Sequence, residues 1–260
     1  SLRFLLPIFF MMYNMEKTEV IIKIEKLHKQ FGTNVVLDGF DMELREGENL
    51  VVMGKSGSGK SVMIKCIIGL EDYQGGSIKV ADKEISQLSR KELDELRTDI
   101  GFLFQGSALY DSMSVRENLE FPLRRHPKKI GKLTDTTPLV LEALESVGLA
   151  HAIDLMPNEL SGGMKRRIAL ARTLILKPKI ILYDEPTTGL DPITSKEIIL
   201  LMQSIQKKYN TSSIIITHDV DCAKAIANRM ILLIDGMNYA EGTFEDLQAA
   251  TDPKIKAFFK

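Results

Sequence analysis

The chain has 260 residues, which suits one large domain or a core with one subdomain, and its 44% hydrophobic and 27% charged residues argue against disordered, collagenous and coiled-coil proteins. The 34 basic and 35 acidic residues give a net charge of −1, which disfavours nucleic-acid binding through overall positive charge. Cys66 and Cys222 lie in no CxxC or His–Cys cluster, so the sequence fits a reducing compartment and predicts no zinc site.

The N-terminus carries an apolar run, Leu2–Tyr13, that Pro7 interrupts. It is shorter than the roughly 18 to 20 residues of a membrane span, and no signal-peptide cleavage site follows it. We interpret residues 1–14 as a hydrophobic extension outside the fold; a short anchor that contacts a membrane or partner, or a signal peptide, are the alternatives.

The first part of the chain predicts an antiparallel β layer that leads into a central sheet. Residues 18–28 alternate apolar and polar side chains, as a half-buried strand does. Further strands are expected at 35–44 and 49–53. The elements expected next are a helix at 60–70, a strand at 77–80, a charged helix at 88–97 and a strand at 100–104.

A change of pattern follows. Between residues 106 and 160 apolar residues recur at helical spacing, as at Leu141, Leu144 and Val147, which predicts a mainly helical insert with a polar loop at 125–137. Pro138 is well placed at a helix start.

Afterwards strands and helices alternate. The runs 179–183, 213–217 and 230–234 are continuously apolar, as is typical of parallel strands buried on both faces. Helices are expected at 165–176, 194–208 and 219–228.

The expected fold is α/β with a mainly parallel sheet and right-handed crossovers. We expect one domain over 15–250, with its core at 15–105 and 166–250 and a helical subdomain at about 106–165, and a C-terminal tail at 251–260. Phe258 and Phe259 in that tail favour a terminal helix packed on its own core; contact with a neighbouring subunit is the alternative.

Residues 54–61 match the phosphate-loop pattern G-x-x-x-x-G-K-[ST] between a predicted strand and a predicted helix. Glycines let the backbone N–H groups of such a loop point at phosphate, and the helix start adds positive potential. The ammonium of Lys60 would bridge the β- and γ-phosphates, and the hydroxyl of Ser61 would ligate Mg²⁺. A Gly/Ser-rich turn is the alternative, which the strand–loop–helix context disfavours. The residues of the predicted loop are Gly54, Lys55, Ser56, Gly57, Ser58, Gly59, Lys60 and Ser61.

Polar side chains follow three of the predicted strands, where an open parallel sheet binds its ligands. Asp184 would hold Mg²⁺ through water and Glu185 would be the general base for the attacking water. His218 would sense the γ-phosphate and orient Glu185, and Gln105 would reach the metal and the water. A solvated strand end and a structural histidine are the alternatives.

The segment Leu160–Met164 (LSGGM) predicts a second anion-binding helix start. Ser161 can cap the following helix, and Gly162 and Gly163 allow close approach to the backbone. Because the phosphate loop already binds the chain's own phosphates, this second site is useful if it acts on the nucleotide of another subunit.

These motifs, with Gly189-Leu190-Asp191, occur in an order that resembles the ATPase subunits of ABC transporters, and the resemblance covers about Val20 to Thr243. It implies that Phe31 stacks on adenine, a core phenylalanine being the alternative, and that Asp191 couples two sites across a dimer.

The resemblance further implies an enzyme that hydrolyses ATP with Mg²⁺ as a head-to-tail homodimer. Residues 54–61 of one chain and Ser161 and Gly163 of the other would enclose each ATP. The groove near Gln105, formed largely by residues 106–123, would receive a helix of an integral-membrane permease. The chain would then act at the cytoplasmic face of the inner membrane, with no nucleic acid as partner.

Finer features are similar to the phospholipid-trafficking ATPases of the Mla type, whose partners include an MCE-domain protein. Met164 departs from the Gln that most ABC ATPases carry, and the segments 155–167, 105–124 and 252–259 point the same way. This resemblance implies phospholipid or related lipid transport between inner and outer membranes of a diderm bacterium.

Three alternatives remain. A small-solute importer of the amino-acid type predicts LSGGQ, against which Met164 counts. A non-transport ABC ATPase usually has two ATPase units or long coiled-coil insertions, which a single unit of this length disfavours. A nucleotide-binding module without turnover is disfavoured by the presence of both Asp184 and Glu185.

Overall fold

The computed structural model describes residues 19–131 and 135–259, so our prediction for residues 1–14 lies outside the described part. None of the helices in these two ranges is long and apolar enough to cross a membrane. The elements in chain order are β1 (Val20–Phe31), β2 (Asn34–Arg45), β3 (Asn49–Met53), α2 (Lys60–Ile67), β4 (Gly75–Val80), β5 (Lys83–Glu84), α3 (Arg90–Arg97), β6 (Ile100–Leu103), α4 (Val115–Arg125), α5 (Pro127–Ile130), α6 (Thr137–Glu145), α7 (Gly162–Leu174), β7 (Ile180–Asp184), α8 (Pro192–Tyr209), β8 (Ser212–Thr217), α9 (Val220–Ile226), β9 (Arg229–Ile234), β10 (Met237–Gly242), α10 (Phe244–Ala249) and α11 (Pro253–Lys256), with short 3₁₀ turns at Ile85–Gln87, Ala150–Ala152 and Pro157–Glu159.

Two sheets form the core. The central sheet has six strands in the order β10-β9-β3-β8-β7-β6, and all its pairs are parallel except that of β9 with β10. The other sheet has the order β2-β1-β4-β5 and is antiparallel. The predicted α/β fold with an antiparallel N-terminal layer is therefore confirmed. Sequence analysis missed β5, which is only two residues long, and β10, whose side chains alternate between exposed and half-buried and so form no apolar face.

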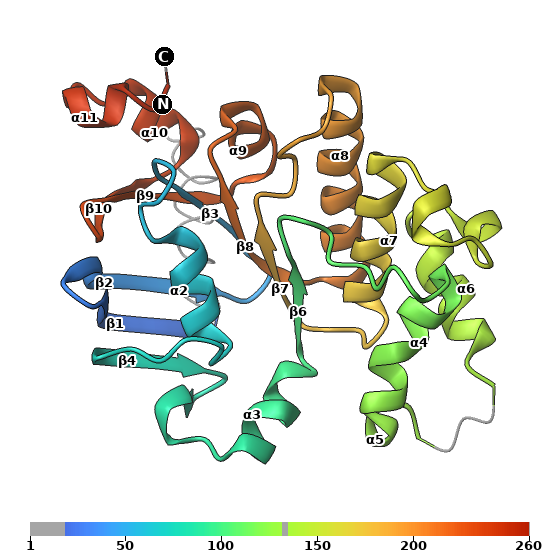
Figure 1. Cartoon of the computed structure of the whole chain (residues 1–260). Coiled ribbons are helices and arrows are strands. Elements are labelled where there is room, and N and C mark those ends of the chain that lie inside the picture. Colours follow the sequence, from blue (N-terminus) through green and yellow to red (C-terminus); the bar gives the residue numbers. More distant parts are fainter. Residues whose placement is uncertain (1–18, 132–134, 260) are drawn as a thin grey trace, which may run out of the picture.

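Alternation along the buried strands builds a core on each face of the central sheet. In β3, Val51 and Met53 join the apolar cluster that includes α7, α8 and α9, whereas Leu50 and Val52 join the cluster that includes α2 and the antiparallel sheet. Figure 1 shows these layers, with α7 and α8 on one side of the central strands and α2 with β1 and β2 on the other. A continuous apolar run is what a strand with two covered faces requires.

The segment between β6 and α7 is mainly helical and lies beside α7 (Figure 1). Helix α4 begins at a capping box in which Ser114 and Glu117 bond each other's backbone N–H groups. The amide of Asn118, which is fully buried, bonds backbone groups of Tyr110, Met113 and Ser114 and so shapes the loop before α4. The domain limits given above remain a prediction.

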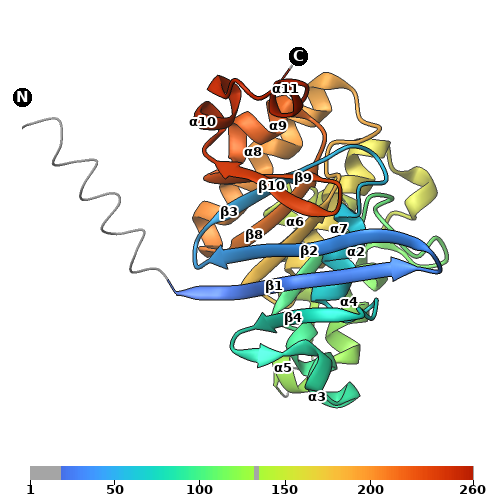
Figure 2. The same cartoon turned by 90° about the vertical axis from the view of Figure 1, so that its left-hand side faces the viewer.

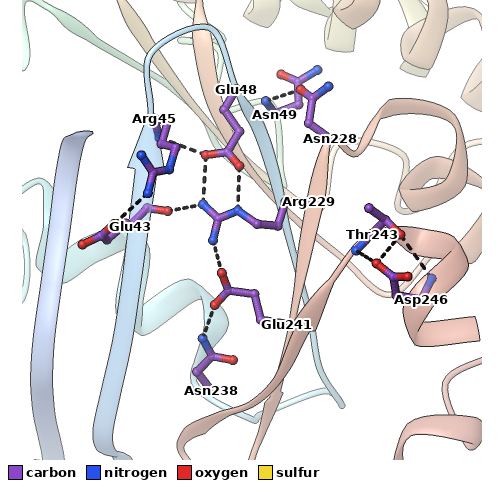
Figure 3. A network of polar contacts seen from close by, with 10 residues as sticks. All are labelled: Glu43, Arg45, Glu48, Asn49, Asn228, Arg229, Asn238, Glu241, Thr243 and Asp246. Carbon is purple, nitrogen blue, oxygen red and sulfur yellow. Dashed lines mark hydrogen bonds and ion pairs between the residues drawn. The ribbon is translucent and has the colours of Figure 1, made fainter. Parts of the chain in front are cut away.

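Arg229 at the start of β9 joins the two sheets (Figure 3). Its guanidinium donates to both carboxylate oxygens of Glu48, at 2.7 and 2.9 Å, and to the carbonyl of Glu43 on β2 at 2.6 Å. Glu241 on β10 is a further ion-pair partner. Because Glu48 is buried, this bidentate pair fixes how the antiparallel layer sits on the central sheet.

The C-terminal tail packs on its own chain. Tyr239 on β10 donates to Asp252 at 2.7 Å, and Phe259 meets Phe244 edge to face. In Figure 2 helices α10 and α11 lie together above β10.

Candidate active site

The phosphate loop leaves the buried strand β3, which pairs with both β8 and β9, and enters α2. At Gly54 a Cβ atom would lie 2.5 Å from the Ser58 hydroxyl and 2.8 Å from a backbone carbonyl. Gly59 has φ +100°, and a Cβ there would lie 2.7 Å from Val36. Only glycine fits this tight loop at these two positions.

Lys60 fills the inside of the loop. Its Nζ donates to the carbonyls of Gly54 at 2.8 Å and Lys55 at 3.0 Å. Burial lowers the pKa of Lys60, although the nearby charges of Glu185 and Asp184 oppose this shift. The hydroxyl of Ser58 is buried with no hydrogen-bond partner in the described structure. An inward cation and an unsatisfied hydroxyl in a backbone cradle fit the oxygens of a phosphate group.

Asp184 ends strand β7 beside the phosphate loop. The Ser61 hydroxyl donates to Asp184 Oδ1 at 2.9 Å, although the two residues are far apart in sequence. Burial raises the pKa of Asp184, and this hydrogen bond partly opposes the shift. A buried carboxylate beside a hydroxyl is a donor set that suits Mg²⁺, because the ion prefers oxygen ligands and its charge would stabilise the ionised carboxylate.

Glu185 follows with a left-handed backbone, φ +51°, which is uncommon for a residue other than glycine. Its N–H donates to the carbonyl of Ile216 on β8 at 2.9 Å, which anchors this turn. Its carboxylate Oε2 accepts from Thr188 Oγ1 at 3.0 Å and lies 2.8 Å from His218 Nδ1. Oε1 lies 4.0 Å from Lys60 Nζ. The structure thus brings Lys60, Asp184, Glu185 and His218 to one edge of the sheet.

Among the described residues, no hydrogen bond or ion pair joins Gln105 or Phe31 to this group. The side chain of Gln105 is exposed, and the backbone carbonyl of the same residue accepts from Arg166 at 2.5 Å. Phe31 ends β1 and is 45% exposed, with Lys29 Nζ 4.3 Å from its ring centre. Because it is exposed, the Phe31 ring is accessible for stacking.

The LSGGM residues and Asp191 form a separate cluster. Ser161 caps α7 by accepting from the N–H of Met164 at 3.2 Å, and Gly162 is exposed beside it. Asp191 caps α8 and accepts from Thr194, whose bond lowers the pKa of Asp191. A Cβ at Gly163 would lie 2.8 Å from Thr194 Cγ2, so the two helix starts touch. Within the two described ranges, no hydrogen bond or ion pair links this cluster to the phosphate loop.

Sequence analysis missed two residues that contact this site. Thr188 bonds Glu185, and its position three residues later in the same turn was an available signal. Arg166 is 3% exposed and bonds the carbonyls of Phe104 and Gln105. A charged residue on the apolar face of a predicted helix was its only signal.

A pocket of about 810 Å³ adjoins the outside of the phosphate loop. It lies between the first residues of β2, the loop, the β9–β10 turn and the tail, and its walls include Val36, Ser56, Asp235 and Phe258. The volume is that of a small-molecule site.

Comparison with known proteins agrees with this geometry. The profile of the ABC transporter family matches residues 37–188, more than half of the chain. The chain belongs to the ABC transporter family. It is the ATPase component of such a transporter, and it binds ATP and uses Mg²⁺ for hydrolysis.

The relatives of this ABC ATPase differ in the cargo that their names describe. It is 40% identical to the methionine import ATP-binding protein MetN of Campylobacter jejuni over 92% of this chain and 75% of that protein. It is 38% identical to the intermembrane phospholipid transport system ATP-binding protein MlaF of Haemophilus influenzae, over 92% of this chain and 90% of that protein. A dimeric ATP-binding cassette in a post-hydrolysis state, bound to ADP and Pi, superposes with a TM-score of 0.77 at 32% identity, over 86% of this chain and 98% of that one.

Proposed function

We propose that residues 54–61 bind the phosphates of ATP and that Glu185 activates the attacking water. The support is geometric: the buried Lys60 ammonium, the Ser58 hydroxyl, which has no partner in the part of the chain that the structure describes, and the Glu185 carboxylate lie at one edge of the sheet. In this proposal Lys60 exchanges its bonds with the Gly54 and Lys55 carbonyls for bonds with phosphate oxygens. Glu185 takes the proton of the water, and His218 holds the carboxylate in place.

Ser61, Asp184 and Gln105 are the proposed metal ligands. Mg²⁺, when bound, neutralises negative charge on the β- and γ-phosphates. The Ser61–Asp184 hydrogen bond supports this assignment because it holds the two oxygens together before any metal binds.

The proposed active form is a head-to-tail homodimer. Ser161 and Gly163 of one chain would cover the ATP held by residues 54–61 of the other, with Phe31 stacked on the adenine and Asp191 coupling the two sites. Two observations support this arrangement: among the described residues no hydrogen bond or ion pair joins the LSGGM cluster to the phosphate loop of its own chain, and the related cassette bound to ADP and Pi is dimeric.

A groove of about 430 Å³ beside Gln105 is the proposed binding site for a permease helix. Its walls include Phe104 and Tyr110, which are large and exposed, together with Phe121 and Arg172. Exposed aromatic side chains around a groove are typical of a protein interface. Binding there would hold the ATPase peripherally at the cytoplasmic face of the inner membrane.

We propose phospholipid, or a related lipid, as the cargo, moved between inner and outer membranes with an MCE-domain protein as partner. The observation that carries this proposal is Met164, which stands where most ABC ATPases carry Gln and packs half-buried against the core that includes α7. The similarity to MlaF supports the same cargo. The second candidate is methionine import, favoured by 40% identity to MetN.

Affinity purification distinguishes the two cargoes. Tagged Glu185→Gln would be isolated with Mg²⁺-ATP from detergent-solubilised membranes of the encoding organism, because loss of the general base traps the closed complex. Mass spectrometry would identify proteins, and extraction would identify lipids. A permease with an MCE-domain protein and enriched phospholipid supports lipid transport. A permease with a methionine-binding protein supports import, and ribosomes or DNA without a permease would contradict both.

A further inference from the structure

Arg166 links the start of α7, near the LSGGM residues, to the residues that follow β6. It lies in the second turn of α7, the helix that Ser161 caps. Its Nη1 donates to the carbonyl of Phe104 at 2.7 Å and its Nη2 to the carbonyl of Gln105 at 2.5 Å. These two carbonyls belong to the residues directly after β6, so their hydrogen bonds come from a side chain of α7.

The contacts of Arg166 are not those that stability alone would select. The residue is 3% exposed, yet both its partners are uncharged carbonyls, and its Nε donor is buried with no acceptor among the described residues. A buried guanidinium with an unsatisfied donor costs free energy, and an apolar side chain of similar volume is often more stabilising at such a place. The arginine therefore points to a role in the reaction.

The bonded carbonyls lie next to the proposed chemistry. Strand β6 pairs with β7 up to Leu103 and Tyr183, so Phe104 and Gln105 continue beside Asp184. The charge of Asp184 also opposes the lowering of the Arg166 pKa that burial causes. A planar guanidinium that spans two successive carbonyls fixes both distance and orientation, which a single ammonium cannot do.

We propose that Arg166 is a positioning residue that links the start of α7 to the loop of Gln105. A shift of the LSGGM cluster, which covers the partner's nucleotide in the proposed dimer, then moves Gln105 at the chain's own metal site. This inference rests on the proposed roles of Gln105 and of the LSGGM cluster, and it adds the residue that connects them.

The test is a double-mutant cycle between Arg166→Met and Gln105→Ala in the full-length chain. We expect Arg166→Met to lower kcat roughly 10- to 100-fold, as small misplacements of catalytic groups do. The Kd for ATP should stay within about twofold, and the Mg²⁺ concentration for half-maximal rate should rise. Because Arg166 acts through Gln105, the double variant should be no slower than Gln105→Ala alone.

Arg167→Met is the matched control. This neighbouring arginine bonds Glu197 at 2.6 Å and the carbonyl of Val147 at 3.3 Å, and neither lies at the Gln105 loop. It should keep the wild-type rate and Mg²⁺ dependence. An equal loss in both arginine variants would overturn the link, and so would additive losses in the cycle.

Two further outcomes are distinguishable. A wild-type rate for Gln105→Ala would contradict the proposed metal site itself, whereas a slow Gln105→Ala with an additive Arg166→Met would contradict only the link. If Arg166→Met does not fold, Arg166→Lys serves instead, because it keeps the charge and can donate to one carbonyl. We expect an intermediate kcat for that variant. A wild-type kcat would show that the guanidinium does not need to bond both the Phe104 and the Gln105 carbonyl.

Discussion

His218 Nδ1 lies 2.8 Å from Glu185 Oε2, and this contact joins the residues that directly follow β8 and β7. Thr188 donates to the same carboxylate oxygen from within the Glu185 turn. The carboxylate is buried while the His218 side chain is 64% exposed, so the histidine reaches in from the open side of the site. A carboxylate held from two directions has little freedom to rotate.

Replacement of His218 by Ala should lower kcat about 10- to 100-fold and leave the Kd for ATP near its wild-type value, because the variant loses orientation of Glu185 and not the phosphate loop. Steady-state rates and binding of a fluorescent ATP analogue measure the two quantities. Thr188→Ser keeps the hydroxyl and should remain close to wild type. A weakened Kd with unchanged kcat would remove His218 from this role.

Glu185→Gln should bind ATP normally and hydrolyse it about 10² to 10⁴ times more slowly, as the loss of a general base does. Gel filtration with Mg²⁺-ATP should show the variant accumulating as a dimer, because ATP remains intact. A variant that turns over at the wild-type rate would show that Glu185 is not the base.

Lys60→Ala should weaken ATP binding about 100-fold, because charge-assisted bonds to phosphate contribute about 1.5–3 kcal/mol each. Isothermal titration measures this change. Lys55→Ala is the control: its side chain is exposed in the same loop, and the backbone carbonyl that contacts Lys60 remains. An equal loss in the two variants would mean that overall loop charge, and not the buried ammonium, binds the phosphates.

The two LSGGM glycines should respond differently to alanine. Gly163→Ala should destabilise the fold by about 1–2 kcal/mol, because its Cβ meets Thr194 Cγ2 at 2.8 Å. Thr194→Ser removes that methyl group and should restore the stability. The Cβ of Gly162→Ala would have no described atom of its own chain within 4 Å, so this variant should melt like wild type. It should nevertheless hydrolyse ATP more slowly. Thermal melts and rates check both, and full activity of Gly162→Ala would count against a partner nucleotide at this face.

Arg229→Met should lower the free energy of unfolding by about 3 kcal/mol, because it leaves the buried Glu48 carboxylate without its cation. Urea denaturation measures this loss. Lys23→Met breaks the exposed pair with Glu25 and should change stability little. Similar losses in the two variants would show that the Arg229 network does not hold the sheets together.

Local sequence patterns were sufficient for most of the fold. The buried strands β3, β7, β8 and β9 have continuous apolar runs, and each lies within one or two residues of its predicted range. Strand β10 was not predictable in this way, because it has no apolar face. The end of α2 was predicted too late, because apolar residues continue through Ile68 and Leu70 although the helix ends at Ile67.

The residue types of the site were also present in the sequence: a glycine-rich loop with a lysine, and an acidic pair and a histidine after apolar strands. Each of these motifs could be recognised from its own short segment, because its chemistry needs only neighbouring residues along the chain. The tertiary structure decided which of these motifs lie next to one another. Ser61 reaches Asp184, and His218 reaches Glu185, because β3, β8 and β7 are adjacent in the sheet. The bond of Arg166 to the Gln105 loop likewise depends on where α7 crosses the end of β6, and strand order and helix crossing bring together residues that no one-dimensional periodicity connects.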